Sequence, residues 1–259
     1  MDASYIAELF APWRDKHARA AWKPVVAESH TGPFFSWFGG EPTASPNNQW
    51  PACKQCQKEM RFFLQLAFTE LPAQTAMPLK DRIVQLFYCS TDDGSCETWA
   101  PFSGTHHLRV VQPDHKLLTS PPAMDPFPRK VITGWAEIRD TPDPAEHEAC
   151  GLSYKYDFKK ELVDVRCEDP AIVLENANIK LDVAEAISIS APGDKLGGWP
   201  YWVQSVEYPL CPQCQAQMHL LLQIDSEDNL PYMFGDAGCA HLTYCPNHPE
   251  TFAFGWACG

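Results

Sequence analysis

An internal repeat restricts the folds open to this chain more than any other feature of its sequence. Residues 38–66 align with residues 196–224 at a constant offset of 158 without a gap, and 11 of the 29 aligned positions are identical. Both copies share a Gly-Gly-x-Pro turn and a Pro-x-Cys-x-Gln-Cys-Gln motif, and both continue into a short apolar run. Because a repeated unit folds in the same way each time, we predict two pseudo-symmetric lobes that arose by internal duplication.

The lobes are expected to be rich in β-sheet. The apolar runs at 62–66 and 220–224 are only five residues long, which suits buried strands better than helices. The sequence therefore predicts an α+β fold in which two sheet-rich zinc-knuckle lobes, residues 38–104 and 196–259, form one compact two-lobed unit.

Two further segments lie outside the repeat. A leader, residues 1–37, is predicted to be helical because apolar side chains recur on one face, and Pro12 either kinks it or begins a second helix. A connecting segment, residues 105–195, is predicted to be mixed α/β. Its expected elements are a strand at 131–138 and short helices at 145–150 and 181–187.

Cysteine spacing predicts two metal sites, one in each lobe. Zn²⁺ prefers four sulfur or nitrogen ligands in a tetrahedron, and a Cys-x2-Cys turn supplies two of them. The second copy adds a Cys-x2-His motif 31 residues later, which a redox pair of thioredoxin type would not need. The predicted ligand sets are Cys53, Cys56, Cys89 and Cys96 in the first lobe and Cys211, Cys214, Cys245 and His248 in the second.

The two zinc ions are expected to be structural. Four protein ligands leave no open coordination position for a substrate or an activated water molecule. Cys96 aligns with Pro249 rather than with His248, so the closing loop differs between the copies. For these two fourth ligands, a core thiol and a surface histidine are the alternative interpretations. The remaining cysteines lack metal-like spacing and are expected to be buried as small apolar residues: Cys150, Cys167, Cys239 and Cys258.

Charge and hydropathy limit the partners and the compartment. The formal net charge is -13 at pH 7, which disfavours nucleic acid as a partner and suits a basic protein. No apolar run approaches the ~20 residues of a membrane helix, and the N-terminal residues lack the pattern of a signal peptide. We therefore expect a cytoplasmic protein without membrane contact, in which the 11 cysteines stay reduced.

The shared motifs resemble those of known families. Gly-Gly-x-Pro, Cys-x2-Cys, Leu-Leu-Gln-Ile-Asp at 221–225 and Leu-Pro at 230–231 resemble the YwqG-like family of bacterial proteins of unknown function. The segment 132–137 with Pro142 and Pro144 resembles that family as well. The repeated pattern is also similar to programmed cell death protein 2 and its yeast relatives, although the leader and the middle segment differ.

These resemblances imply protein binding. The first family is linked to toxin and immunity gene neighbourhoods, and the second to a chaperone that shields a basic ribosomal protein. Because the leader and the middle segment depart from the chaperone family, the ribosomal client does not carry over to this chain.

Three classes of function follow from the sequence. The preferred one is a non-enzymatic protein-binding module for a basic partner, with a chaperone-like or toxin-immunity role. The second is an enzyme that uses His106 and His107, together with Asp114 and His115, as acid–base or metal groups. The third, a nucleic-acid-binding zinc ribbon, is disfavoured by the charge. Aromatic residues near the Gly-Gly turns suit either an interface or core packing: Trp37, Trp50, Trp199, Tyr201 and Trp202.

Overall fold

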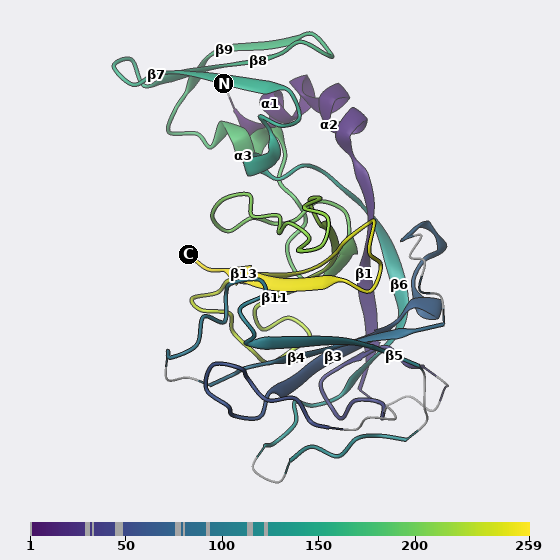
Figure 1. Cartoon of the computed structure of the whole chain (residues 1–259). Helices are drawn as coiled ribbons and strands as arrows, with labels where there is room; N and C mark the ends of the chain where they lie inside the picture. The colour runs from purple at the N-terminus through teal and green to yellow at the C-terminus, as the bar shows by residue number, and fades with distance from the viewer. Residues whose placement is uncertain are drawn as a thin grey trace.

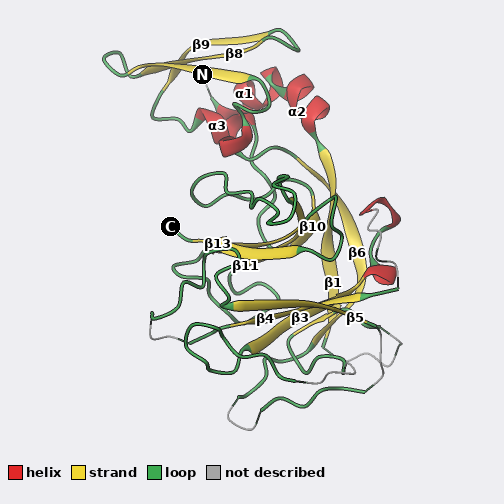
Figure 2. Cartoon of the chain, viewed as in Figure 1, coloured by secondary structure: helices red, strands yellow, loops and turns green. Residues whose placement is uncertain are grey.

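The fold consists mainly of antiparallel β-sheet (Figures 1 and 2). The computed structural model describes residues 2–28, 32, 34–44, 49–75, 79, 81–91, 94–112, 116–121 and 124–259. A ten-stranded sheet has the strand order β13-β12-β11-β10-β1-β6-β2-β3-β4-β5, and a second sheet has the order β7-β8-β9. Within the described residues, no helix is long and apolar enough to cross a lipid bilayer.

The elements have the following bounds. The large sheet contains β1 Arg19–Ala27, β2 Trp37–Phe38, β3 Arg61–Ala67, β4 Ile83–Tyr88, β5 His106–Val111, β6 Lys130–Asp140, β10 Lys195–Gly197, β11 His219–Asp225, β12 Cys239–Tyr244 and β13 Phe252–Ala257. The small sheet contains β7 Leu152–Asp157, β8 Leu162–Cys167 and β9 Ile172–Asn178. The helices are α1 Ala3–Leu9, α2 Ala11–His17 and α3 Val183–Ile187, with 3₁₀ turns η1 Phe68–Glu70, η2 Ala73–Thr75 and η3 Pro144–Glu146.

The two halves of the large sheet repeat the same strand register. Strands β2 to β5 lie on one side of the central pair β1 and β6, and β10 to β13 lie on the other. Trp37 of β2 pairs with Gln65 of β3, and Lys195 of β10 pairs with Gln223 of β11, which are the same positions at the offset of 158. The register of β3 shifts after Phe62, and that of β11 shifts at the equivalent place.

Both halves contribute to one hydrophobic core. The sheet folds over so that β13 and β11 form a layer facing β3 and β4 (Figure 1). The ring centroid of Tyr88 lies 5.6 Å from that of Phe254, and Phe63 lies 6.1 Å from Phe234. The indole N–H of Trp256 donates a hydrogen bond of 2.7 Å to the Tyr88 hydroxyl. The lobes are therefore held together by shared aromatic packing, in which each buried ring contributes roughly 1.5–3 kcal/mol.

The N-terminal helices pack on the small sheet instead of on the lobes. Trp13 of α2 donates its indole N–H to the Cys150 carbonyl at 3.1 Å, and Arg14 donates to the Ile187 carbonyl at 2.9 Å. Helices α1 to α3 and strands β7 to β9 thus form a module at one end of the molecule (Figure 1). A second core fills this module: Ile6, Phe10, Trp13, Leu152, Val163, Val165, Cys167, Ile172, Leu174, Ala177, Val183 and Ile187.

The leader differs from the fully helical segment predicted for residues 1–37. Its helices end at His17, and Pro12 stands in the first turn of α2, so it begins a second helix instead of kinking the first. Residues 19–27 form β1, which pairs with β6 along its whole length. Pro24 is tolerated there because β10 pairs with β1 only at Ala21 and Trp22. Pairing with distant strands, which local periodicity does not report, decides the conformation of this segment.

The connecting segment is divided between the two sheets. The predicted strand at 131–138 lies within β6, and the predicted helix at 181–187 corresponds to the shorter α3. The helix expected at 145–150 is reduced to the 3₁₀ turn η3, in which the Asp143 carboxylate accepts a hydrogen bond from the Ala145 N–H.

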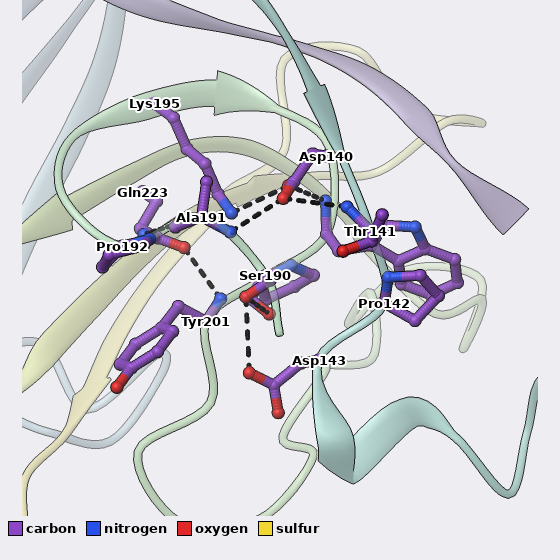
Figure 3. A network of polar contacts seen from close by, with 12 residues as sticks. Asp140, Thr141, Pro142, Asp143, Ser190, Ala191, Pro192, Lys195, Tyr201 and Gln223 are labelled. Carbon is purple, nitrogen blue, oxygen red and sulfur yellow. Dashed lines mark hydrogen bonds and ion pairs between the residues drawn. The ribbon is translucent and has the colours of Figure 1, made fainter. Parts of the chain in front are cut away.

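A buried ion pair fastens the module to the second lobe (Figure 3). The Asp140 carboxylate, at the end of β6, accepts a hydrogen bond of 2.8 Å from the Lys195 ammonium group, and the two side chains are 1% and 0% exposed. Asp140 also accepts hydrogen bonds from the backbone N–H groups of Thr141, Ala191 and Trp199. The chain enters the module at Thr141 and leaves it at Ala191. The Asp140 carboxylate therefore accepts a hydrogen bond from each of the two connections between the module and the large sheet.

We predict that Asp140→Asn destabilises the protein by about 3–5 kcal/mol, because it leaves the Lys195 charge buried without a counter-ion. The control is Asp15→Asn, which breaks the exposed ion pair with Arg139 and should cost less than about 1 kcal/mol. Urea unfolding followed by circular dichroism measures both losses. Equal losses in the two variants would contradict this role of the buried pair.

Candidate metal centres

Each Cys-x2-Cys motif lies in a tight turn that the backbone closes in the same way in both lobes. In the first lobe the Gln57 N–H donates to the Cys53 carbonyl at 2.9 Å, and Gln57 has a φ of 62°. In the second lobe Gln215 donates to the Cys211 carbonyl at 2.8 Å, with a φ of 59°. A positive φ at a residue other than glycine is uncommon, so its recurrence marks a specific turn.

The strand pairing explains why the other ligands arrive at these turns. Strands β3 and β4 are antiparallel, and Arg61 at the start of β3 pairs with Tyr88 at the end of β4. Cys89 follows Tyr88 directly and therefore lies beside the turn that precedes β3. In the second lobe the pairing of His219 with Tyr244 places Cys245 in the same way.

The four sulfur atoms of the first lobe are close enough together to bind one ion. The Sγ atoms of Cys53 and Cys96 are 3.7 Å apart, as are those of Cys56 and Cys89. All four lie within 4.8 Å of one another. A tetrahedron with Zn–S bonds of about 2.3 Å has edges of about 3.8 Å, which matches these distances. The four cysteines are free thiols, without disulfide bonds.

The second lobe has an equivalent group with one nitrogen ligand. His248 places its Nδ1 atom 3.6 Å from the Sγ atoms of both Cys211 and Cys245. The Sγ atom of Cys214 lies 3.6 Å from that of Cys245. The structure thus brings together both predicted sets of four side chains, and each set is geometrically able to bind a metal ion.

One thiol in each group is predisposed to ionise. Burial acts to raise the pKa of Cys56, but hydrogen bonds from the Lys58 backbone and neighbouring thiols lower it to about 7. A hydrogen bond from the Ala216 backbone is the main cause that lowers the pKa of Cys214 to about 6. Because the thiolate is the metal-binding form of cysteine, these two residues are suited to bind an ion first.

Burial opposes ionisation at other ligand thiols. Burial raises the pKa of Cys89 to about 12 and also raises the pKa of Cys245. A bound cation favours the thiolate at each position and opposes this cost.

His106 and His107 do not come together as an acid–base pair. They are consecutive residues of strand β5, so their side chains point to opposite faces of the sheet. Burial lowers the pKa of His106 to about 4, and its ring lies 5.8 Å from that of Phe254. Burial also lowers the pKa of His107. Asp114 and His115, the other members of the predicted group, lie outside the described residues.

The aromatic residues near the Gly-Gly turns belong largely to the interior. Trp37 and Trp199 are 2% and 6% exposed. Trp50, Tyr201 and Trp202 are half-buried. For the two buried tryptophans the structure favours core packing over a free interface.

Comparisons with known proteins assign a family but no activity. The model of a family described as "Domain of unknown function (DUF1963)" matches residues 36–247, a span that contains seven of the eight candidate ligands. A stretch of 60 residues is 38% identical to the "Uncharacterized protein YpfL" of Salmonella typhimurium. This match covers 23% of the chain and only 14% of that relative.

The geometry predicts two bound metal ions per chain and the loss of one from Cys211→Ser, which removes a sulfur ligand from the second group. Native mass spectrometry counts the ions directly. The control is Cys167→Ser, which changes a buried free cysteine of the module core outside both groups and should keep both ions. An unchanged metal content in Cys211→Ser would show that the second group is not a metal site.

Proposed function

The chain belongs to the DUF1963 family, whose function is unknown, and from this premise we propose that it is a non-enzymatic protein-binding module with one structural zinc ion in each lobe. The proposal rests on the observation that both groups supply a complete set of four protein ligands. Each contains four protein ligands within 4.8 Å of one another, which leaves no coordination position for a substrate. The metal therefore stabilises the fold, and the binding function is carried out by the protein surface.

Zinc is the ion that the two ligand sets suit best. Four sulfurs, or three sulfurs and one imidazole nitrogen, in a tetrahedron are typical of structural zinc. Such an ion contributes on the order of 10 kcal/mol to folding, comparable with the net stability of a whole domain. A reducing compartment such as the cytoplasm would keep all these thiols available for the metal.

The repeated geometry supports an origin by internal duplication. Three features recur at the same offset of 158 residues: the Cys-x2-Cys turn, the strand register, and the register shift within β3 and β11. A second ion in the second copy follows naturally from this origin, since each lobe then inherits its own knuckle. We propose the pseudo-symmetry of the two lobes on this basis.

The second lobe, taken together with residues 191–195, presents an acidic surface on which no lysine or arginine of this segment is exposed. Residues 191–259 contain seven Asp and Glu residues and a single Lys. That Lys195 is fully buried in the ion pair with Asp140. The exposed acidic residues of this segment are Glu207, Glu227, Asp228, Asp236 and Glu250. Such a surface attracts a basic protein and repels nucleic acid, which favours a chaperone-like or immunity role.

The test is affinity capture of the tagged chain from its native cells, followed by mass spectrometry of bound proteins. We expect a basic protein in stoichiometric amount that is retained at about 0.1 M salt and released at about 0.5 M, where charges are screened over a few ångströms. The triple variant Glu227→Gln, Asp228→Asn, Asp236→Asn should lose this partner, because it neutralises three exposed charges of the second lobe.

The matched control neutralises three acidic residues of the module instead: Glu148→Gln, Glu168→Gln and Asp169→Asn. It changes the net charge by the same amount and should keep the partner. If no protein is captured, or if both triple variants lose the partner equally, the acidic surface of the second lobe is not the binding site.

A further inference from the structure

A cleft of about 460 Å³ lies where the module meets the second lobe. The module contributes Glu146, β1 contributes Arg19, and the second lobe contributes aromatic residues that include Trp199, Tyr208 and Tyr244. Its volume falls in the range of small-molecule binding sites, about 300–1,000 Å³, and such sites are common at the junction of two structural units. The cleft belongs to neither metal centre.

Arg19 is held in a fixed place at this cleft. Its guanidinium carbon lies 3.3 Å from the centroid of the Trp199 ring. Trp199 is itself buried, donates its indole N–H to the His17 carbonyl at 2.9 Å and donates its backbone N–H to Asp140 at 2.8 Å. A guanidinium stacked on a rigid indole is pre-organised, and its in-plane N–H groups can still bind a planar anion.

The charges of the cleft favour an anionic ligand. Tyr208 lines the cleft together with Arg19 and Glu146, and its hydroxyl interacts electrostatically with both charged groups. Glu146 is buried and accepts a hydrogen bond of 2.8 Å from the Trp202 indole N–H, so a neutral donor already stabilises its carboxylate. Among the described residues, no carboxylate lies within the 4.0 Å ion-pair distance of Arg19. The guanidinium is therefore the charge available to a ligand.

The same balance restricts the anion to a single charge. Arg19 is the only lysine or arginine that lines the cleft in the described part of the chain, and Glu146 opposes it. A phosphate group with two charges would be repelled by that carboxylate, whereas a carboxylate matches the planar fork of arginine.

The wall of the cleft suits a flat ring. His219 and Tyr244 lie side by side in β11 and β12, with ring centroids 5.8 Å apart and planes at 77°. Together with Tyr208 they give the cleft an aromatic lining that can pack against the faces and edges of a bound ring. A ligand with one carboxylate and one ring would use both features.

From this geometry we propose that the cleft binds a small aromatic monocarboxylate, whose carboxylate pairs with Arg19 and whose ring packs against His219 and Tyr244. Binding of this ligand does not depend on the protein partner proposed above. The cleft could not be predicted from the sequence because Arg19, Glu146 and Tyr244 are far apart in the chain and belong to no common motif.

The probes for the test are naphthoate and its neutral amide, naphthamide, titrated into the isotopically labelled full-length chain with its metal bound. Nuclear magnetic resonance follows the indole N–H of Trp199. We expect naphthoate to shift this signal and to bind at least ~10-fold more tightly than naphthamide, because only the acid pairs with Arg19.

Three variants locate the interaction. Arg19→Gln should reduce the affinity for naphthoate at least ~10-fold, to that of the amide, and Arg19→Lys should retain part of it because the charge remains while the planar fork is lost. Arg139→Gln, at an exposed arginine outside the cleft, should bind both probes like the unaltered chain. The proposal is overturned if neither probe binds at about 10 mM, if both bind equally, or if Arg19→Gln keeps the preference for naphthoate.

Discussion

The buried ion pair between Asp140 and Lys195 is the interaction on which the arrangement of this molecule depends. Removing two opposite charges from water is costly, and the cost is offset only when geometry and hydrogen bonding are complete. Burial acts to lower the pKa of Lys195, and the Asp140 carboxylate opposes this effect. Asp140 also accepts hydrogen bonds from three backbone N–H groups. The ion pair thus specifies how the module is joined to the sheet, and it fixes Trp199, on which Arg19 stacks.

The same pair marks the point where the two lobes differ. Lys195 in β10 corresponds to Trp37 in β2 at the offset of 158. At Trp37, the Arg129 guanidinium stacks over the indole at 3.8 Å, and the uncharged indole cannot form an ion pair like that of Lys195. The lobes therefore share their strand register and knuckle turns but differ beside the central strands. Asp140 joins the module to the second lobe through Ala191, Lys195 and Trp199, and the cleft lies on that side as well.

The candidate metal sites and the hydrophobic core lie in different parts of the lobes. The ligand groups lie at the ends of the hairpins β3–β4 and β11–β12, where the first group packs in an aromatic cluster and the second in a much smaller apolar one. Between the layers, aromatic residues of both lobes pack in one core. The proposed structural ions would fasten these hairpin ends to the neighbouring loops, whereas the shared core holds the halves together.

The sequence by itself determined the features that depend on neighbours along the chain. The Cys-x2-Cys turns, the apolar strands that follow them and the recurrence at 158 residues are local patterns, so the two groups of four ligand side chains could be predicted before the structure was known. Only the tertiary structure decided that residues 19–27 form a central strand, that α1 and α2 pack on β7 to β9, and that Arg19 meets Glu146 and Trp199 in a cleft. These features arise from pairing and desolvation between segments distant in the chain. Which of these contacts form depends on the free energy of the whole fold, so they cannot be predicted from the local periodicity of the sequence.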